Sequence, residues 1–132
     1  MLNPLICLAA QGIVRDAETN NISAFSILEQ LNPAGFPAFV ATMGFLVIWR
    51  KAEGDPEQYD GEFRIHNNAT ELLRQPIRID FEGSPSHRSI VGMGGLVLQE
   101  PGTLRFSIWV GGNELAHYEV KVTNPPARAN VG

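Results

Sequence analysis

Apolar and polar residues alternate along two segments near the end of the chain, residues 104–110 and 116–122. A period of two is typical of a β-strand that buries one face and exposes the other. The predicted buried positions are Leu104, Phe106, Ile108 and Val110 in the first segment, and Ala116, Tyr118, Val120 and Val122 in the second. The two segments therefore predict a closing β-hairpin around Gly111 and Gly112.

The length of the hairpin loop decides which residues face each other, because a shift by one residue moves every side chain to the other face. A two-residue loop, Gly111-Gly112, would place Phe106 opposite His117. A three-residue loop that adds Asn113 keeps the apolar residues together. It pairs Ile108 with Ala116, Phe106 with Tyr118, Leu104 with Val120 and Arg105 with Glu119. We therefore predict the three-residue loop.

Residues 90–98 have the pattern of a preceding strand. Its predicted inner face consists of Ile90, Gly92, Gly94, Leu96 and Leu98. A loop of odd length around Pro101-Gly102 would pair Leu98 with Leu104 and Leu96 with Phe106. The cluster of glycines that includes Gly95 predicts a bulge, a bend or the close approach of another backbone.

Residues 38–50 form the most apolar stretch of the chain, and both of its faces are apolar. The odd face is Phe39, Ala41, Met43, Phe45, Val47 and Trp49; the even face is Val40, Thr42, Gly44, Leu46 and Ile48. Two apolar faces predict a central strand, a strand covered on its outer side, or an interface. The β-branched residues, the aromatic residues and Gly44 argue against a helix.

Shorter patterns complete a count of about eight strands. They are Leu5–Gln11, Ile22–Leu31, a strand around Phe63 and Ile65, and the alternation of Ile77, Ile79 and Phe81 with charged residues. Residues 70–75 are expected to form one helical turn before Pro76. Short strands separated by frequent turns predict an all-β, antiparallel sandwich of two sheets, immunoglobulin-like or of the jelly-roll type, with a closed barrel as the alternative.

Composition and charge narrow the class of protein. The 132 residues are 44% hydrophobic and 18% charged, which fits a single domain over 1–132 in which 126–132 form a flexible tail. The net charge of −4 argues against binding to nucleic acid or to an anionic membrane. The first residues lack the basic region of a signal peptide, and Cys7 is the lone cysteine, so we expect a cytoplasmic protein without disulfides.

The two ends of the chain also resemble a known family. The resemblance lies in the strand, polar turn and strand of Leu5–Gln11 and Asn21–Leu28, and in the ending formed by Pro101–Ile108, Gly112 and Tyr118–Val122. These segments are similar to a family of short bacterial single-domain proteins described only as a domain of unknown function. The resemblance implies a β-sandwich that stands alone, and it brings no catalytic or binding residues.

Candidate catalytic and metal-binding residues are few. Zinc would need three or four converging ligands, but His66, His87, His117 and Cys7 include no closely spaced pair. Ser84, Ser86 and His87 follow Asp80 and contain the residue types of a hydrolytic triad, although no Gly-x-Ser-x-Gly turn is present. Residues 53–62 hold five carboxylates and could bind calcium, but their spacing does not match an EF-hand loop.

The aromatic residues indicate contact with another protein rather than a reaction. Trp109 is predicted on the face opposite Phe106, beside Leu115, and Trp49 is a second candidate, so these residues form the candidate interface. We therefore expect a non-catalytic protein without cofactors that acts through a protein partner or self-association. A structural component of a bacteriophage-like particle is the alternative, and a calcium- or carbohydrate-binding module or a small hydrolase is a weaker one.

Overall fold

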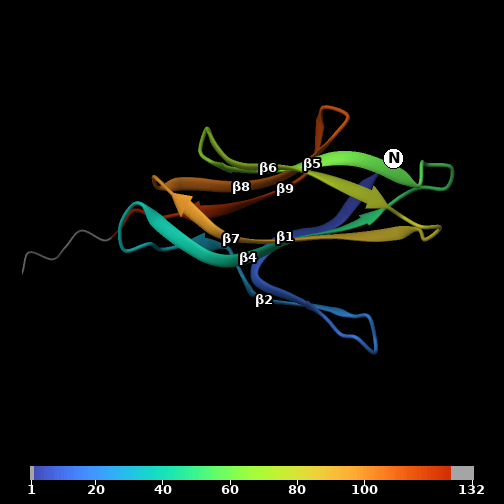
Figure 1. Cartoon of the computed structure of the whole chain (residues 1–132), viewed down its shortest axis with the longest axis horizontal. Coiled ribbons are helices and arrows are strands. Elements are labelled where there is room, and N and C mark those ends of the chain that lie inside the picture. Colours follow the sequence, from blue (N-terminus) through green and yellow to red (C-terminus); the bar gives the residue numbers. More distant parts are fainter. Residues whose placement is uncertain (1, 126–132) are drawn as a thin grey trace, which may run out of the picture.

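The computed structural model of the protein describes residues 2–125, which form two β-sheets packed face to face (Figure 1). The strands are β1 Asn3–Arg15, β2 Ile22–Ile27, β3 Gln30–Leu31, β4 Ala38–Arg50, β5 Gln58–Asn67, β6 Thr70–Asp80, β7 Ser86–Leu98, β8 Gly102–Val110 and β9 Asn113–Val122. Sheet A has the order β2-β1-β4-β7, and sheet B has the order β3-β9-β8-β5-β6. The expected tail at 126–132 lies outside the described residues.

The two sheets confirm the predicted sandwich. Both sheets have free edges, whereas a closed barrel has none. Nine strands are present in the described residues instead of the eight expected, because β3 joins β9 as a short parallel strand. Two residues are too few to show an alternating pattern, so β3 could not be predicted as a separate element.

The core lies between the sheets and is built around three phenylalanines. The ring of Phe45 from β4 lies 5.2 Å from that of Phe63 and 5.6 Å from that of Phe106, measured between ring centroids. Trp49 is also fully buried, and its indole N–H donates a hydrogen bond of 2.9 Å to the Ser89 hydroxyl. The pairing of the indole N–H allows this large side chain to be buried without an unsatisfied donor.

The closing hairpin has the predicted register but a shorter loop. Ile108 faces Ala116, Phe106 faces Tyr118 and Arg105 faces Glu119, as expected. However, Val110 pairs directly with Asn113, so the loop contains only Gly111 and Gly112, both at positive φ. A bulge at Leu115 supplies the extra residue that restores the apolar register.

The predicted pairing of residues 90–98 with the next strand is wrong. β7 belongs to sheet A and β8 to sheet B, so Leu98 and Leu104 lie in the core on different sheets. The chain crosses between the sheets at residues 99–103, where the side chains of Asn67 and Asn68 hold it. The Asn67 carboxamide accepts the Gln99 and Glu100 N–H groups, and that of Asn68 accepts the Thr103 N–H and donates to the Pro101 carbonyl.

The glycine cluster, where a bulge, a bend or a close backbone approach was predicted, interrupts the alternation of β7 and changes which side chains face inward. Gly95 has a φ of 72°, and the alternation along β7 shifts at this point. Ile90 is therefore exposed, whereas Leu96 and Leu98 are buried. The same shift in β4 turns Phe39 outward, although the alternation had placed it with Phe45.

The predicted helical turn at residues 70–75 is wrong, because these residues begin strand β6. Pro76 lies within this strand, opposite Glu62 of β5. A proline has no N–H to donate to a neighbouring strand, and it is tolerated here because β6 is the edge of sheet B.

Candidate functional site

The large hydrophobic side chains that remain exposed are distributed unequally between the two sheets. Eight such side chains, from 41% to 70% exposed, are found among the described residues. They are Leu5, Ile6, Val14, Phe25, Ile27, Phe39, Ile90 and Val97. All eight belong to β1, β2, β4 or β7, so every one of them lies in sheet A.

A hairpin projects from sheet A and carries part of this surface. The end of β1 and the whole of β2, residues 11–27, leave the sheet as a protruding hairpin, which we call the arm (Figure 1). Its turn is closed by the Asp16 carboxylate, which accepts the Glu18 and Thr19 N–H groups. These bonds hold the pKa of Asp16 below its ordinary value. The tip of the arm is thus a defined turn.

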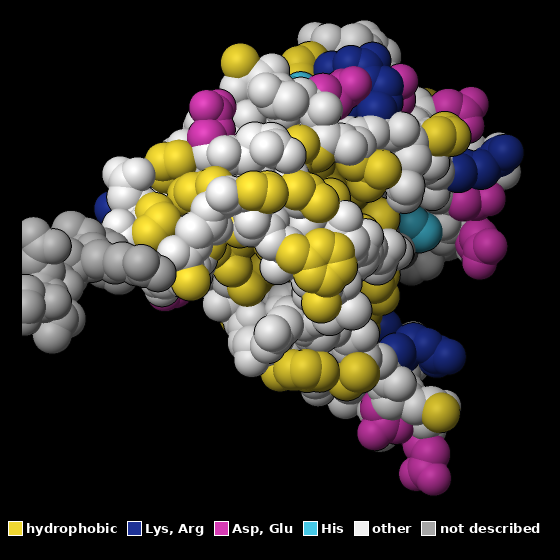
Figure 2. Space-filling view, turned by 60° about the vertical axis from the view of Figure 1, so that its left-hand side comes forward, with side chains coloured by type: hydrophobic (Ala, Val, Ile, Leu, Met, Phe, Trp, Pro, Cys, Tyr) yellow, Lys and Arg dark blue, Asp and Glu magenta, His cyan; other side chains and the backbone are white. Residues whose placement is uncertain are grey.

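The two faces of the arm have different surroundings. On one face, Ile13 packs over Gly44 of β4, where an added Cβ would lie 3.0 Å from its Cδ1 atom. On the other face, Val14, Phe25 and Ile27 are at least half exposed. Hydrophobic side chains are visible on the protruding arm in Figure 2. The arm therefore packs on sheet A with one apolar face and presents the other to solvent.

The outer face of sheet A adds exposed apolar side chains to those of the arm. Because directly paired residues share a face, Leu8, Leu46 and Ile90 form one row across the sheet, and Ile6 and Ile48 belong to the next. Of these, Ile6 and Ile90 remain 46% and 45% exposed. We define the outer apolar surface as Ile6, Ile90 and the exposed face of the arm.

The outer face of sheet B is covered by ion pairs instead. The guanidinium of Arg64 lies 2.7 Å from the Glu62 carboxylate, which Arg74 also contacts, and these contacts lower the pKa of Glu62. Further along, Arg105 contacts the carboxylates of Glu114 and Glu119 at 2.6 and 3.2 Å. These charges satisfy each other within the chain, so this face resembles an ordinary solvated surface.

The structure does not assemble the candidate interface residues into one patch. Trp109 lies on the outer face of sheet B, half-buried, with the Arg64 guanidinium 4.4 Å from its ring centroid. Its partner across the hairpin is Glu114 rather than Leu115, because Leu115 is the bulged residue and packs against the core. Trp49 is fully buried in the core and presents no surface to a partner.

The candidate triad residues line one hollow but do not form a triad. The His87 imidazole is hydrogen-bonded to the backbone of Asp80 rather than to its carboxylate. Among the described residues, no hydrogen bond links the His87 side chain to Ser84 or Ser86, and the Ser84 hydroxyl accepts the Ser86 N–H. The Asp80 carboxylate accepts hydrogen bonds from Gln58 and from its own turn.

Burial raises the pKa of the Cys7 thiol to about 12, which keeps it protonated and weakly nucleophilic.

The acidic segment at residues 53–62 is divided between a turn and strand β5. Glu57 forms an ion pair of 2.9 Å with Lys51, which lowers the pKa of Glu57, and Asp55 accepts the Ala52 N–H. Within residues 2–125, no group of three or more His, Cys, Asp or Glu side chains is arranged to hold a metal ion. The carboxylates of this segment do not converge on one centre.

His87 gives a testable pH dependence. Burial lowers its pKa, and the nearby carboxylates of Asp80 and Glu82 oppose that effect. The folded state thus binds this proton less tightly than the unfolded state, so we expect the free energy of unfolding to fall as the pH drops from about 7.5 to 5. In urea titrations, His87→Gln should flatten this part of the profile. A profile that His87→Gln leaves unchanged would contradict the prediction.

The sequence did not indicate the exposed face of the arm. Phe25 and Ile27 alternate with the small residues Ala24 and Ser26, which is also the pattern of a strand that covers a core. Only the departure of the arm from the sheet leaves them uncovered (Figure 1).

The described part of the chain contains no helix long and apolar enough to cross a membrane.

Comparisons with known proteins identify a family and show a similarity to solved structures. Residues 5–123 match a family described as a family of unknown function, DUF6941. No curated protein shows significant similarity to the sequence. Among solved structures, the chain is similar to an immunoglobulin-like protein from Pseudomonas aeruginosa, with 14% identity and a TM-score of 0.41, over 93% of this chain and 97% of the other.

Proposed function

The chain belongs to this family of unknown function, whose description assigns no role, and we propose that it is a non-catalytic β-sandwich protein that acts through protein–protein contact. The observation that carries the proposal is the unequal distribution of exposed hydrophobic side chains between the sheets. Contiguous exposed apolar surface is typical of interaction sites. The ion-paired outer face of sheet B offers no comparable surface.

A second copy of the chain is the partner that we propose for this surface. Two identical apolar faces can cover each other about a twofold axis, which is the commonest symmetry of soluble oligomers. The chain has a net charge of −4, so two copies repel each other in general. The exposed face of the arm, Val14, Phe25 and Ile27, contains no charged side chain and is where two copies can approach most easily.

The proposal is tested by removing the apolar side chains of the arm. The double variant Phe25→Ser and Ile27→Ser should sediment as a monomer at concentrations where the wild-type chain sediments as a larger species. Both side chains are about half exposed, so the variant should keep the fold, which circular dichroism and thermal unfolding would verify.

Trp109→Ser is the matched control, because it replaces an aromatic residue on the outer face of the other sheet by the same small residue. It should leave the sedimentation of the wild type unchanged. A monomeric wild-type chain, or a Trp109→Ser variant that alone dissociates, would overturn the proposed surface.

A structural component of a bacteriophage-like particle would instead form a closed assembly of many copies. The cytoplasmic location stays a prediction from the sequence.

A further inference from the structure

A groove runs along the free edge of β7, on the side where the edges of the two sheets meet. A hollow of about 440 Å³ lies between β6 and β7, and its walls include Ile77 and Arg78 from β6 and Arg88, Ile90 and Gly92 from β7. A second hollow, of about 490 Å³, shares Arg88 and Ile90 with the first and continues the groove toward the loop between the two strands.

The backbone of β7 is accessible in this groove. Among the described residues, β7 pairs with β4 alone, so its other side has no partner strand. An added Cβ on Gly92 would meet no atom within 4 Å, and Ile90 is 45% exposed. A free strand edge of this kind can accept an extended peptide as an additional strand. β6 is less suited to this, because Pro76 removes one of its N–H donors.

The arginines of the groove differ from those on sheet B. Arg64, Arg74 and Arg105 each contact a glutamate. Within the described residues, neither Arg78 nor Arg88 forms an ion pair with a carboxylate. Arg88 donates a hydrogen bond of 2.6 Å to the Asn20 carbonyl, and Arg78 donates to the Gln58 carboxamide.

The first hollow also contains no carboxylate of its own, whereas the second is lined by Asp80 and Glu82. The first hollow is therefore lined by positive charge alone, whereas in the second the charges of Arg15 and Arg88 offset those of Asp80 and Glu82. Guanidinium groups that lack an acidic partner are suited to bind carboxylates from another molecule.

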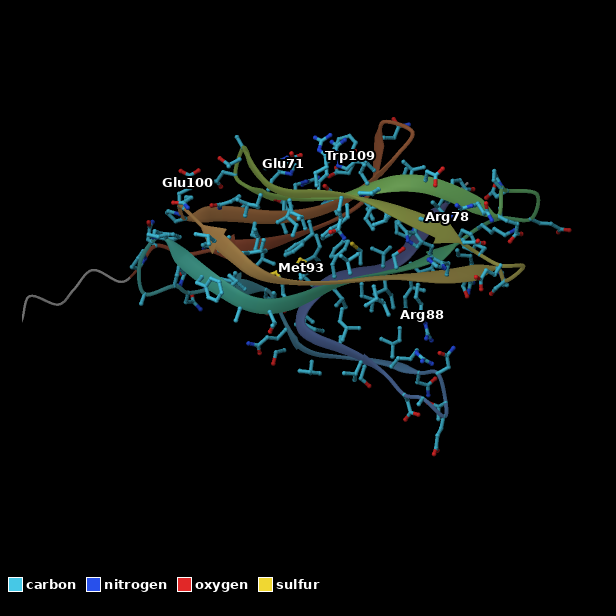
Figure 3. All side chains as sticks on the ribbon, in the orientation of Figure 1. Glu71, Arg78, Arg88, Met93, Glu100 and Trp109 are labelled. Atoms are coloured by element: carbon cyan, nitrogen blue, oxygen red, sulfur yellow. The ribbon has the colours of Figure 1, made fainter. Side chains whose placement is uncertain are left out.

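The two arginines lie on opposite sides of β7. In Figure 3, Arg78 is on the side of sheet B, and Arg88 is on the side that faces the arm. A strand added to the edge of β7 would direct its side chains alternately to these two sides. Two consecutive acidic residues could thus reach one arginine each, while apolar neighbours would contact Ile77 and Ile90.

We propose that the free edge of β7 binds an extended acidic peptide segment of another protein by strand addition, with Arg78 and Arg88 each contacting a carboxylate. This site shares Ile90 with the outer apolar surface but includes no residue of the exposed face of the arm. The double variant Phe25→Ser and Ile27→Ser should therefore bind the peptide at least as tightly as the wild type, so that the two proposals can fail independently.

The test uses a fluorescein-labelled peptide, Thr-Val-Glu-Glu-Val-Thr, and fluorescence anisotropy. The wild-type chain should bind it, and Arg78→Gln and Arg88→Gln should each weaken binding about tenfold to a hundredfold, as the loss of one hydrogen bond to a charged group implies. Arg50→Gln is the matched control, since Arg50 is exposed on β4 outside the groove. Hydrogen exchange should show that the peptide protects amides of β7.

Three kinds of binding result would overturn the proposal. The first is an absence of peptide binding to the wild-type chain. The second is that Arg78→Gln and Arg88→Gln bind the peptide as tightly as the wild type does. The same holds if the wild type binds equally tightly a peptide in which glutamine replaces both glutamates. The third is equally tight binding of a labelled oligothymidylate, which would indicate a general anion site. Unprotected β7 amides in the complex would exclude strand addition.

Discussion

Replacing Phe45 by alanine is expected to lower the free energy of unfolding by about 3–5 kcal/mol, the largest effect that we predict for a single residue. Phe45 is fully buried and contacts the rings of Phe63 and Phe106 from the opposite sheet. Alanine would leave a cavity at the point where the two sheets meet. Because domains of this size are stable by only about 5–15 kcal/mol, the variant should unfold at a much lower urea concentration.

Phe39 provides the matched control for this substitution. It is the same residue type on the same strand, but its side chain is 70% exposed. Phe39→Ala should therefore change the free energy of unfolding by no more than about 0.5 kcal/mol. Similar losses of stability in the two variants would show that the assignment of inner and outer positions along β4 is wrong.

Replacing Gly94 by alanine should destabilise the protein by about 1–3 kcal/mol. A Cβ at this position would lie 2.6 Å from the backbone oxygen of Ala41 on β4. Because the obstructing atom belongs to the backbone, it cannot move aside as a side-chain terminus could. The two strands would have to separate locally, and urea or thermal unfolding would measure the cost.

Gly92 lies two residues away on the same strand and tests the same argument. An added Cβ there would meet nothing within 4 Å. Gly92→Ala should therefore be nearly neutral, or slightly stabilising because alanine restricts the unfolded chain. If Gly92→Ala is as destabilising as Gly94→Ala, then the close approach of Ala41 is not the cause.

The alternation of apolar residues predicted most of the strands but could not assign them to sheets. Leu98 and Leu104 show the same pattern whether their strands pair side by side or face each other across the core. The register of the closing hairpin was predictable, since the pairing of Phe106 with Tyr118 kept the apolar residues together. Its loop length was not, because the bulge at Leu115 has no marker in the sequence.

The surface that we propose for protein contact was harder to predict. The apolarity of both faces of residues 38–50 predicted a central strand, a strand covered on its outer side or an interface, and β4 is a central strand of sheet A. Trp109 was a reasonable candidate for an exposed anchor, but Arg64 from the neighbouring strand lies over its ring. Which hydrophobic residues stay uncovered depends on contacts between distant segments, such as the packing of Ile13 over Gly44.

The most direct test of the proposed contact is hydroxyl-radical footprinting of the wild-type chain at low and at high protein concentration. We predict that Phe25, Ile27 and Ile90 become less reactive as the concentration rises, while Trp109 keeps its reactivity. Protection of Trp109 instead, or reactivities that do not depend on concentration at any of these residues, would contradict self-association through the outer apolar surface of sheet A.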